Sequence, residues 1–145
     1  MNENEINVLD ELNKGACMGM DAINYILDKV EDESLKKELD RQYREYKEIS
    51  EEIHQMYPKY NHDEETPHET NAMNKAMTWY GINMKTLLDK STSKIAEMLL
   101  QGTNMGIIEG RKLLNNKETE ESVNDLVKKY VSMQEKAVEK LKPFL

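Results

Sequence analysis

The spacing between Glu51 and His54 is the first feature of this sequence that could support chemistry. Residues three positions apart lie on one side of a helix, so the carboxylate and the imidazole of a Glu-x-x-His pattern can bind one metal ion together. Within the expected helices, the chain contains this pattern once. The apolar positions Ile49 and Ile53 are expected to face inward, which leaves Glu51 and His54 on the flank or the outer side of the helix. Their facing direction therefore argues against a metal held inside a helical core.

Other residues with chemical potential favour ordinary structural roles. The ten methionines fall mostly at helical spacing on apolar faces, where methionine is a flexible core filler. His62 and His68 stand in an acidic loop that can attract a cation only weakly, and a solvated loop is the better interpretation. Cys17 has no second cysteine to pair with and no nearby basic residue, so we expect neither a disulfide nor a redox role. The sequence has no Ser-His-Asp order, phosphate-binding glycine loop or Cys-x-x-Cys.

The apolar periodicity predicts an all-α protein. The length of 145 residues fits one domain, 1–145. A first hairpin covers 3–57, with helix 1 at about 3–31 and helix 2 ending before Pro58. A loop follows at 58–69, then a helical pattern from 70 to 116 that needs a bend or break at Gly81 or around 91–93. A last helix covers about 119–142, so that residues 90–142 form a second hairpin.

Charge and hydropathy restrict the partners. The net charge of −8 repels phosphate backbones and anionic membrane surfaces, so we expect neither nucleic acid nor membrane as a partner. The first residues, MNENEINVLDEL, lack the basic and apolar regions of a leader, and no apolar run is long enough to span a bilayer. These features predict a cytoplasmic protein, and the abundance of Lys and Asn over Arg suggests a bacterium with an AT-rich genome.

An internal repeat relates the two hairpins. Shifting the chain by 87 residues, from Leu12 to Leu99, gives eleven identities between residues 12–52 and 99–139, where composition predicts about two or three. Residues 70–89 have no counterpart in the first half, and we interpret them as an added helical segment. Their apolar stripe needs a cover, which can be a fold-back, a second subunit or a ligand.

Two duplicated hairpins joined by a long connection resemble the ferritin-like superfamily of antiparallel four-helix bundles. The resemblance implies a di-iron or di-manganese site built from inward Glu residues and two Glu-x-x-His motifs. The repeat partner of the motif at 51–54 is 138–141, where both ligands are missing, so the chain resembles a bacterial branch that lacks the full ligand set. The residues that could still form an atypical site are Asp10, Glu48, Glu51, His54, Glu97 and Glu135.

Four of the six glycines stand in two matching G-x-x-M-G cassettes inside expected helices. Glycine in a helix interior costs about 1 kcal/mol relative to alanine, so these positions need a packing reason. Small residues four apart let two helix backbones approach closely. We therefore expect helix 1 and the helix through residue 106 to face each other there, through residues Gly15, Met18, Gly19, Gly102, Met105 and Gly106.

A polar stripe on the same helix leaves a further choice open. Lys94, Glu97, Gln101 and Asn104 recur every three or four residues, which is typical of a solvated face, while a buried polar network or a subunit contact is the alternative. The missing ligand motifs and the added segment favour a non-enzymatic bundle that acts in assembly or protein contact, self-associates as a dimer and needs no cofactor. The main alternative is an iron- or manganese-dependent oxidase or iron-handling protein. A small-molecule carrier is a third class.

Overall fold

A computed structural model describes residues 3–61 and 91–145 of the chain. Within these two ranges the protein is all-α, with four α-helices, two short 3₁₀ helices and no strand, which confirms the predicted class for this part. The α-helices are α1 (Glu3–Leu27), α2 (Glu33–Met56), α4 (Thr92–Asn116) and α5 (Glu121–Leu141). The 3₁₀ helices η1 (Tyr57–Lys59) and η2 (Lys142–Phe144) extend the ends of α2 and α5.

Capping residues fix two of the helix starts. The backbone N–H of Leu35 donates to the Asp32 carboxylate at 2.9 Å, so the acid at the N-cap satisfies one of the unpaired donors of α2. At the start of α4, the N–H of Lys94 donates to the Ser91 hydroxyl at 3.3 Å. A helix therefore begins at one of the two places where the sequence predicted a break, while the other, Gly81, lies outside the described residues. α2 ends at Met56, before Pro58 as predicted, and the chain continues through the proline as η1 with Tyr57 still in the right-handed helical region.

The first helix ends earlier than its apolar pattern predicts. α1 stops at Leu27 instead of near residue 31, because the chain tightens into a turn in which the N–H of Lys29 donates to Ile26 O and that of Val30 to Leu27 O. This turn brings the Val30 side chain, 3% exposed, into the core. The apolar period continues through Val30 since the residue is buried, although it is no longer helical.

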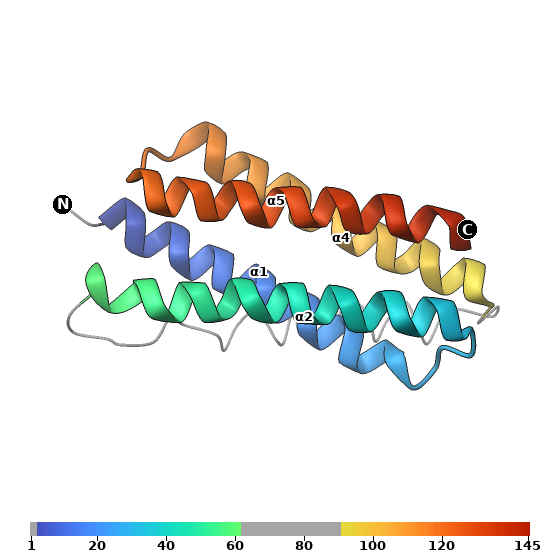
Figure 1. Cartoon of the computed structure of the whole chain (residues 1–145). Helices are drawn as coiled ribbons and strands as arrows, with labels where there is room; N and C mark the ends of the chain where they lie inside the picture. The colour runs from blue at the N-terminus through green and yellow to red at the C-terminus, as the bar shows by residue number, and fades with distance from the viewer. Residues whose placement is uncertain (1–2, 62–90) are drawn as a thin grey trace.

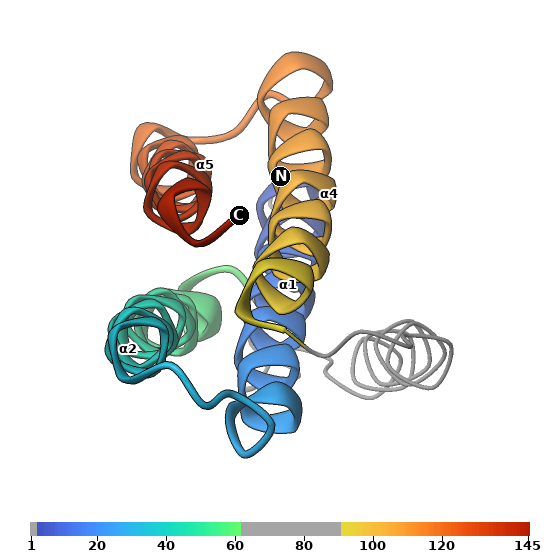
Figure 2. The same ribbon diagram turned by 90° about the vertical axis from the view of Figure 1, so that its right-hand side faces the viewer.

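The four helices lie side by side as a bundle (Figure 1). The chain runs along α1, reverses at residues 28–32 and returns along α2; α4 and α5 repeat this course on the other side (Figure 1). The main contacts are α1 with α2 and α4 with α5. Viewed along the bundle, α2 lies beside α5 and α1 beside α4 (Figure 2).

The core follows the predicted inward stripes. Burying these apolar side chains removes them from water, which is the main force that holds the helices together. Its members include Leu9, Leu12, Ile23 and Ile26 of α1, Leu35, Leu39, Ile49 and Ile53 of α2, Ile95 and Leu99 of α4, and Val123, Leu126, Val127 and Leu141 of α5. The pattern of the sequence thus predicts which face of each described helix is buried.

Several predictions fall on residues 62–90, outside the described ranges. They are the loop at 58–69 beyond Asn61, the added segment at 70–89 and the acidic stretch around His62 and His68. Among the helices that are described, none combines the length and the apolar character needed to cross a bilayer.

Candidate functional site

A cluster of polar side chains lies in the middle of the bundle. Tyr46 of α2, Thr103 of α4, and Tyr130 and Gln134 of α5 are all buried, with exposures between 2% and 8%; we call these four residues the central polar cluster. The rings of Tyr46 and Tyr130 meet edge to face, with 6.5 Å between centroids and 60° between planes. The Gln134 Nε2 donates to the Tyr46 hydroxyl at 3.3 Å. Three helices thus bring polar groups together where a bundle is normally apolar.

Glycines make the room for this cluster. A Cβ placed on Gly19 would lie 2.5 Å from the Tyr46 ring, and one on Gly15 would collide with the Tyr130 hydroxyl. On α4, a Cβ on Gly106 would collide with the Gln134 amide, and one on Gly110 would lie 2.5 Å from Val131. Carbon atoms in contact are normally 3.5–4.0 Å apart, so each of these positions requires glycine or a shift of its neighbour.

The contact partners of the glycines differ from those predicted. The sequence led us to expect α1 and α4 against each other at Gly19 and Gly106, whereas the nearest atoms belong to side chains of α2 and α5. Large aromatic and amide side chains use the space that a bare backbone leaves. Met18 is half-buried and Met105 is 44% exposed on the outside of α4, so Met105 does not flank a buried contact. Gly102, the last of the six residues predicted for the helix contact, is half-buried on α4.

Burial keeps the two core tyrosines protonated. Desolvation strongly raises the pKa of Tyr130, and the neighbouring Tyr46 raises it further, while the Gln134 amide acts in the opposite direction. Burial also raises the pKa of Tyr46, against the lowering effect of its hydrogen bonds with Gln134 and Thr103. Phenols of this kind stay neutral at physiological pH and do not supply a base or a nucleophile. The central polar cluster is therefore suited to positioning helices.

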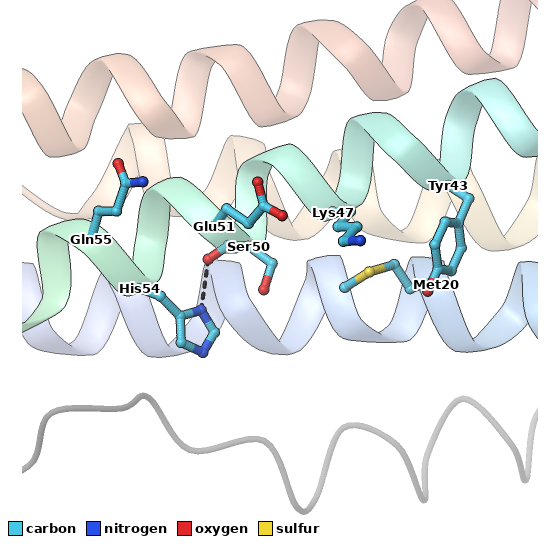
Figure 3. A pocket seen from close by; sticks show the side chains of 7 residues that line it. All are labelled: Met20, Tyr43, Lys47, Ser50, Glu51, His54 and Gln55. Atoms are coloured by element: carbon cyan, nitrogen blue, oxygen red, sulfur yellow. Dashed lines mark hydrogen bonds between the residues drawn. The ribbon is translucent and has the colours of Figure 1, made fainter.

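An open groove of about 510 Å³ follows the surface between α1 and α2. We call it the α1–α2 groove; its lining residues are Met20 of α1 and Tyr43, Lys47, Ser50, Glu51, His54 and Gln55 of α2 (Figure 3). The His54 Nδ1 donates to the Ser50 carbonyl oxygen at 2.7 Å, and the Ser50 hydroxyl donates to Asn13 Oδ1 at 3.2 Å. The first bond holds His54 against its own helix, and the second links α2 to α1.

The structure places two of the six candidate metal ligands in this groove. Glu51 and His54 line it together, but the carboxylate and the ring are turned in different directions (Figure 3). Glu48 is exposed on α2, and Asp10 is half-buried on α1. Among the residues that the structure describes, no three His, Cys, Asp or Glu side chains come close enough to one another to hold a metal ion.

The remaining two candidates engage in surface ion pairs. Glu97 accepts from Lys94 at 3.1 Å within α4, and Glu135 of α5 accepts from Arg111 at 3.0 Å. Both carboxylates are about half exposed, so they point away from the bundle interior. The structure therefore does not assemble the partial site that the sequence suggested from Asp10, Glu48, Glu97 and Glu135.

The interior also lacks the donors that a ferritin-like di-metal centre requires. Such a centre needs several inward carboxylates at the middle of the bundle. Besides the tyrosines, the buried polar side chains of the described residues are Glu5, Asn13, Gln42, Ser50, Thr103 and Gln134. The single carboxylate in this set, Glu5, accepts from the Glu120 N–H at 3.2 Å near the start of α5. The residues present in this part of the chain do not fit a di-iron or di-manganese group.

Comparison with known proteins adds a family. Residues 4–117 match the family described as Domain of unknown function (DUF2383). The chain belongs to this family. No curated protein and no solved structure matches it.

The DUF2383 match includes α1, α2 and α4 and ends before α5 begins. Two residues of the central polar cluster, Tyr130 and Gln134, belong to α5 and lie against Gly15 and Gly106 of the matched part. Gly15, Gly106 and Gly110 of the DUF2383 region are therefore packed by a helix outside the match, while Gly19 is packed by Tyr46 inside it. In this protein the bundle core is built by both parts together.

Sequence reasoning did not foresee the central polar cluster. Tyr46 and Tyr130 lie on the inward faces of α2 and α5, and their hydroxyl groups need partners when buried; that requirement was the available signal. Gln134 gave no signal, because an inward glutamine on α5 is indistinguishable in sequence from a flanking one. The glycines indicated where another group packs closely against α1 and α4, but they did not indicate which side chains pack there.

Proposed function

We propose that this DUF2383 protein is a ferritin-like antiparallel bundle of two duplicated hairpins. The helix boundaries support the duplication: adding 87 to the ends of α1 and α2 brings each within two residues of the corresponding end of α4 or α5. Equivalent positions also share their environment, as Leu12 and Leu99 are both buried, and so are Leu39 and Leu126. The course of the chain in Figure 1 is that of two helical hairpins packed together.

We propose further that the protein is non-enzymatic and acts through protein contact, as a homodimer. The observation that carries this proposal is the outer side of α4, where Met105 and Ile108 are 44% and 48% exposed. Large apolar side chains that adjoin on a charged surface are typical of contact sites. Met105 and Ile108 are three residues apart on one helix and therefore form one small apolar patch.

The interior gives chemistry little support. The central polar cluster contains two tyrosines whose pKa values are raised by burial, and the candidate carboxylates Glu97 and Glu135 are exposed and in ion pairs. A metal-dependent oxidase is not favoured by any specific arrangement among the described residues. The proposal therefore places the function at the surface.

Sedimentation velocity over a range from micromolar to near-millimolar protein tests the proposal. We expect the weight-average sedimentation coefficient to rise with concentration toward that of a dimer of the 17.0 kDa chain. Ile108→Lys, which removes half of the patch, should shift this rise to higher concentration. Lys128→Glu on α5 is an exposed control that should leave it in place. A strict monomer at every concentration would contradict the proposal.

A further inference from the structure

The outer face of α4 carries a regular arrangement of exposed residues. Its members are Glu97, Gln101, Asn104, Met105, Ile108 and Lys112, which we call the α4 outer face. Their spacing of three and four residues places them on one side of the helix, opposite the buried Ile95, Leu99, Thr103 and Gly110. The buried polar network that the sequence allowed here is wrong, since Glu97, Gln101 and Asn104 are all exposed.

The charges on this face are self-complementary. Glu97 and Lys112 are equally far from the midpoint between Asn104 and Met105, at about 11 Å along the helix for a rise of 1.5 Å per residue. A two-fold axis through that midpoint makes two copies of α4 antiparallel. It brings Glu97 of each copy opposite Lys112 of the other, and Ile108 opposite the aliphatic stem of Gln101.

We propose that two copies of this chain pair through the α4 outer face. The pair has two intermolecular Glu97–Lys112 ion pairs, one on each side of the apolar centre formed by Met105 and Ile108. This inference rests on the self-association proposed above and specifies its surface and symmetry. Charge at the ends and apolar groups at the centre form the arrangement of a small isologous interface.

The existing ion pairs on α4 do not prevent this exchange. Glu97 pairs with Lys94 at 3.1 Å and Lys112 with Glu109 at 3.7 Å, each within one helix and about half exposed or more. Exposed pairs of this kind contribute little, so their side chains can turn to a second copy at small cost. Lys94 and Glu109 then remain beside the new pairs and keep both ends of the interface neutral.

The size of the face sets the expected affinity. The stretch from Glu97 to Lys112 is about 22 Å long, and one helix face of that length buries less than the roughly 800 Å² per partner of a standard interface. We therefore expect a weak dimer with a dissociation constant in the micromolar range or above. Because its ion pairs are on the rim, high salt should weaken it.

Charge exchange tests the pairing. Glu97→Lys places two lysines opposite each other at both ends, and Lys112→Glu places two glutamates there, so each single variant should weaken the dimer at least tenfold. The double variant Glu97→Lys/Lys112→Glu restores opposite charges and should return the dissociation constant to within about threefold of the original. An equimolar mixture of the two single variants should form heterodimers, since every pair across that interface is then attractive.

Matched controls separate this effect from net charge. Glu121→Lys and Lys128→Glu are exposed positions on α5 and change the net charge by the same amounts. They should leave the dissociation constant, measured by sedimentation equilibrium, unchanged. Far-UV circular dichroism checks that each variant keeps its helix content.

Three outcomes overturn the inference, and they can be told apart. If the original chain dimerises while Glu97→Lys and Lys112→Glu behave like the α5 controls, the dimer uses another surface and the proposed function stands. If the original chain is monomeric throughout, the proposed function fails and the pairing fails with it. Failure of the mixed variants to associate, with both singles weakened, refutes the two-fold register.

Discussion

Replacing Gly19 by alanine tests how the central polar cluster is packed. An added Cβ would lie 2.5 Å from Tyr46 Cζ and 2.6 Å from both Cε atoms, about 1 Å inside normal carbon contact. The ring has little freedom to retreat, because its edge meets Tyr130 and its hydroxyl accepts from Gln134. The substitution should therefore strain the core although alanine is the better helix former.

The magnitude follows from two opposing effects. Overpacking costs about 1–3 kcal/mol, and an overlap of about 1 Å with a held ring belongs in the upper part of that range, at about 2–3 kcal/mol; exchanging glycine for alanine in a helix returns about 1 kcal/mol. We expect a net loss of about 1–2 kcal/mol in the free energy of unfolding, which lowers the melting temperature by roughly 2–8 °C for a chain of this size. Urea unfolding followed by circular dichroism at protein concentrations below dimerisation measures the change.

A second background makes the prediction sharper. Tyr46→Leu removes the ring that the new Cβ would meet, so Gly19→Ala in that background should stabilise the protein by up to about 1 kcal/mol. The sign of the alanine effect thus reverses between the two backgrounds. A neutral or stabilising Gly19→Ala in the original chain, or the same loss in both backgrounds, would refute the packing argument.

Three further predictions concern ionisation, capping and metal. Burial raises the pKa of Tyr46 and Tyr130 above the unfolded value near 10, so the free energy of unfolding should be constant below that pH and fall above it. In Tyr130→Phe this fall should be about 1.4 kcal/mol per pH unit less steep. Urea midpoints between about pH 8 and pH 11 measure it, and equal slopes would count against burial of the phenol. Asp32→Ala removes the N-cap of α2 and should cost about 1 kcal/mol, whereas Asp28→Ala in the same turn should stay within about 0.5 kcal/mol. Protein purified without a tag or chelator should hold far less than one Fe, Mn or Zn per chain by elemental analysis. A stoichiometric metal that is lost in Glu48→Ala would show that a site exists.

Regular apolar spacing explains why most of the described fold could be predicted. Stripes such as Leu35, Leu39, Ile49 and Ile53 need one buried side at a 3.6-residue period, and a single sequence displays that period directly. The end of α2 before Pro58 was equally visible, because proline acts on the local backbone. The end of α1 at Leu27 was predicted too late in the chain. Val30, which lies beyond it, is buried and continues the apolar period after the helix has ended.

Contacts between distant helices were harder to predict. The cassettes indicated that another part of the chain packs closely against Gly19 and Gly106. That part can be the backbone of the opposite glycine-containing helix or a large side chain of α2 or α5, and in both cases it is a side chain. Which of the two packs there depends on a rotation of the helix about its own axis by a few tens of degrees. The apolar period of the sequence does not define that rotation so accurately. For the same reason the sequence left Glu97 undecided between a buried network and an exposed face.

The central polar cluster supplies what apolar stripes alone lack, a unique register between the hairpins. Two leucine-rich helices can slide by one turn and still bury similar area, because one apolar side chain replaces another. A slide that moves Tyr130 off Gly15 forces its ring against a Cβ, and one that separates Gln134 from Tyr46 leaves buried polar groups unpaired. Both penalties act between hairpins, since Gly15 and Tyr46 belong to the first and Tyr130 and Gln134 to the second. The register fixed in this way also fixes how α4 is turned, and the side of α4 opposite Thr103 and Gly110 is the one on which Met105 and Ile108 are exposed.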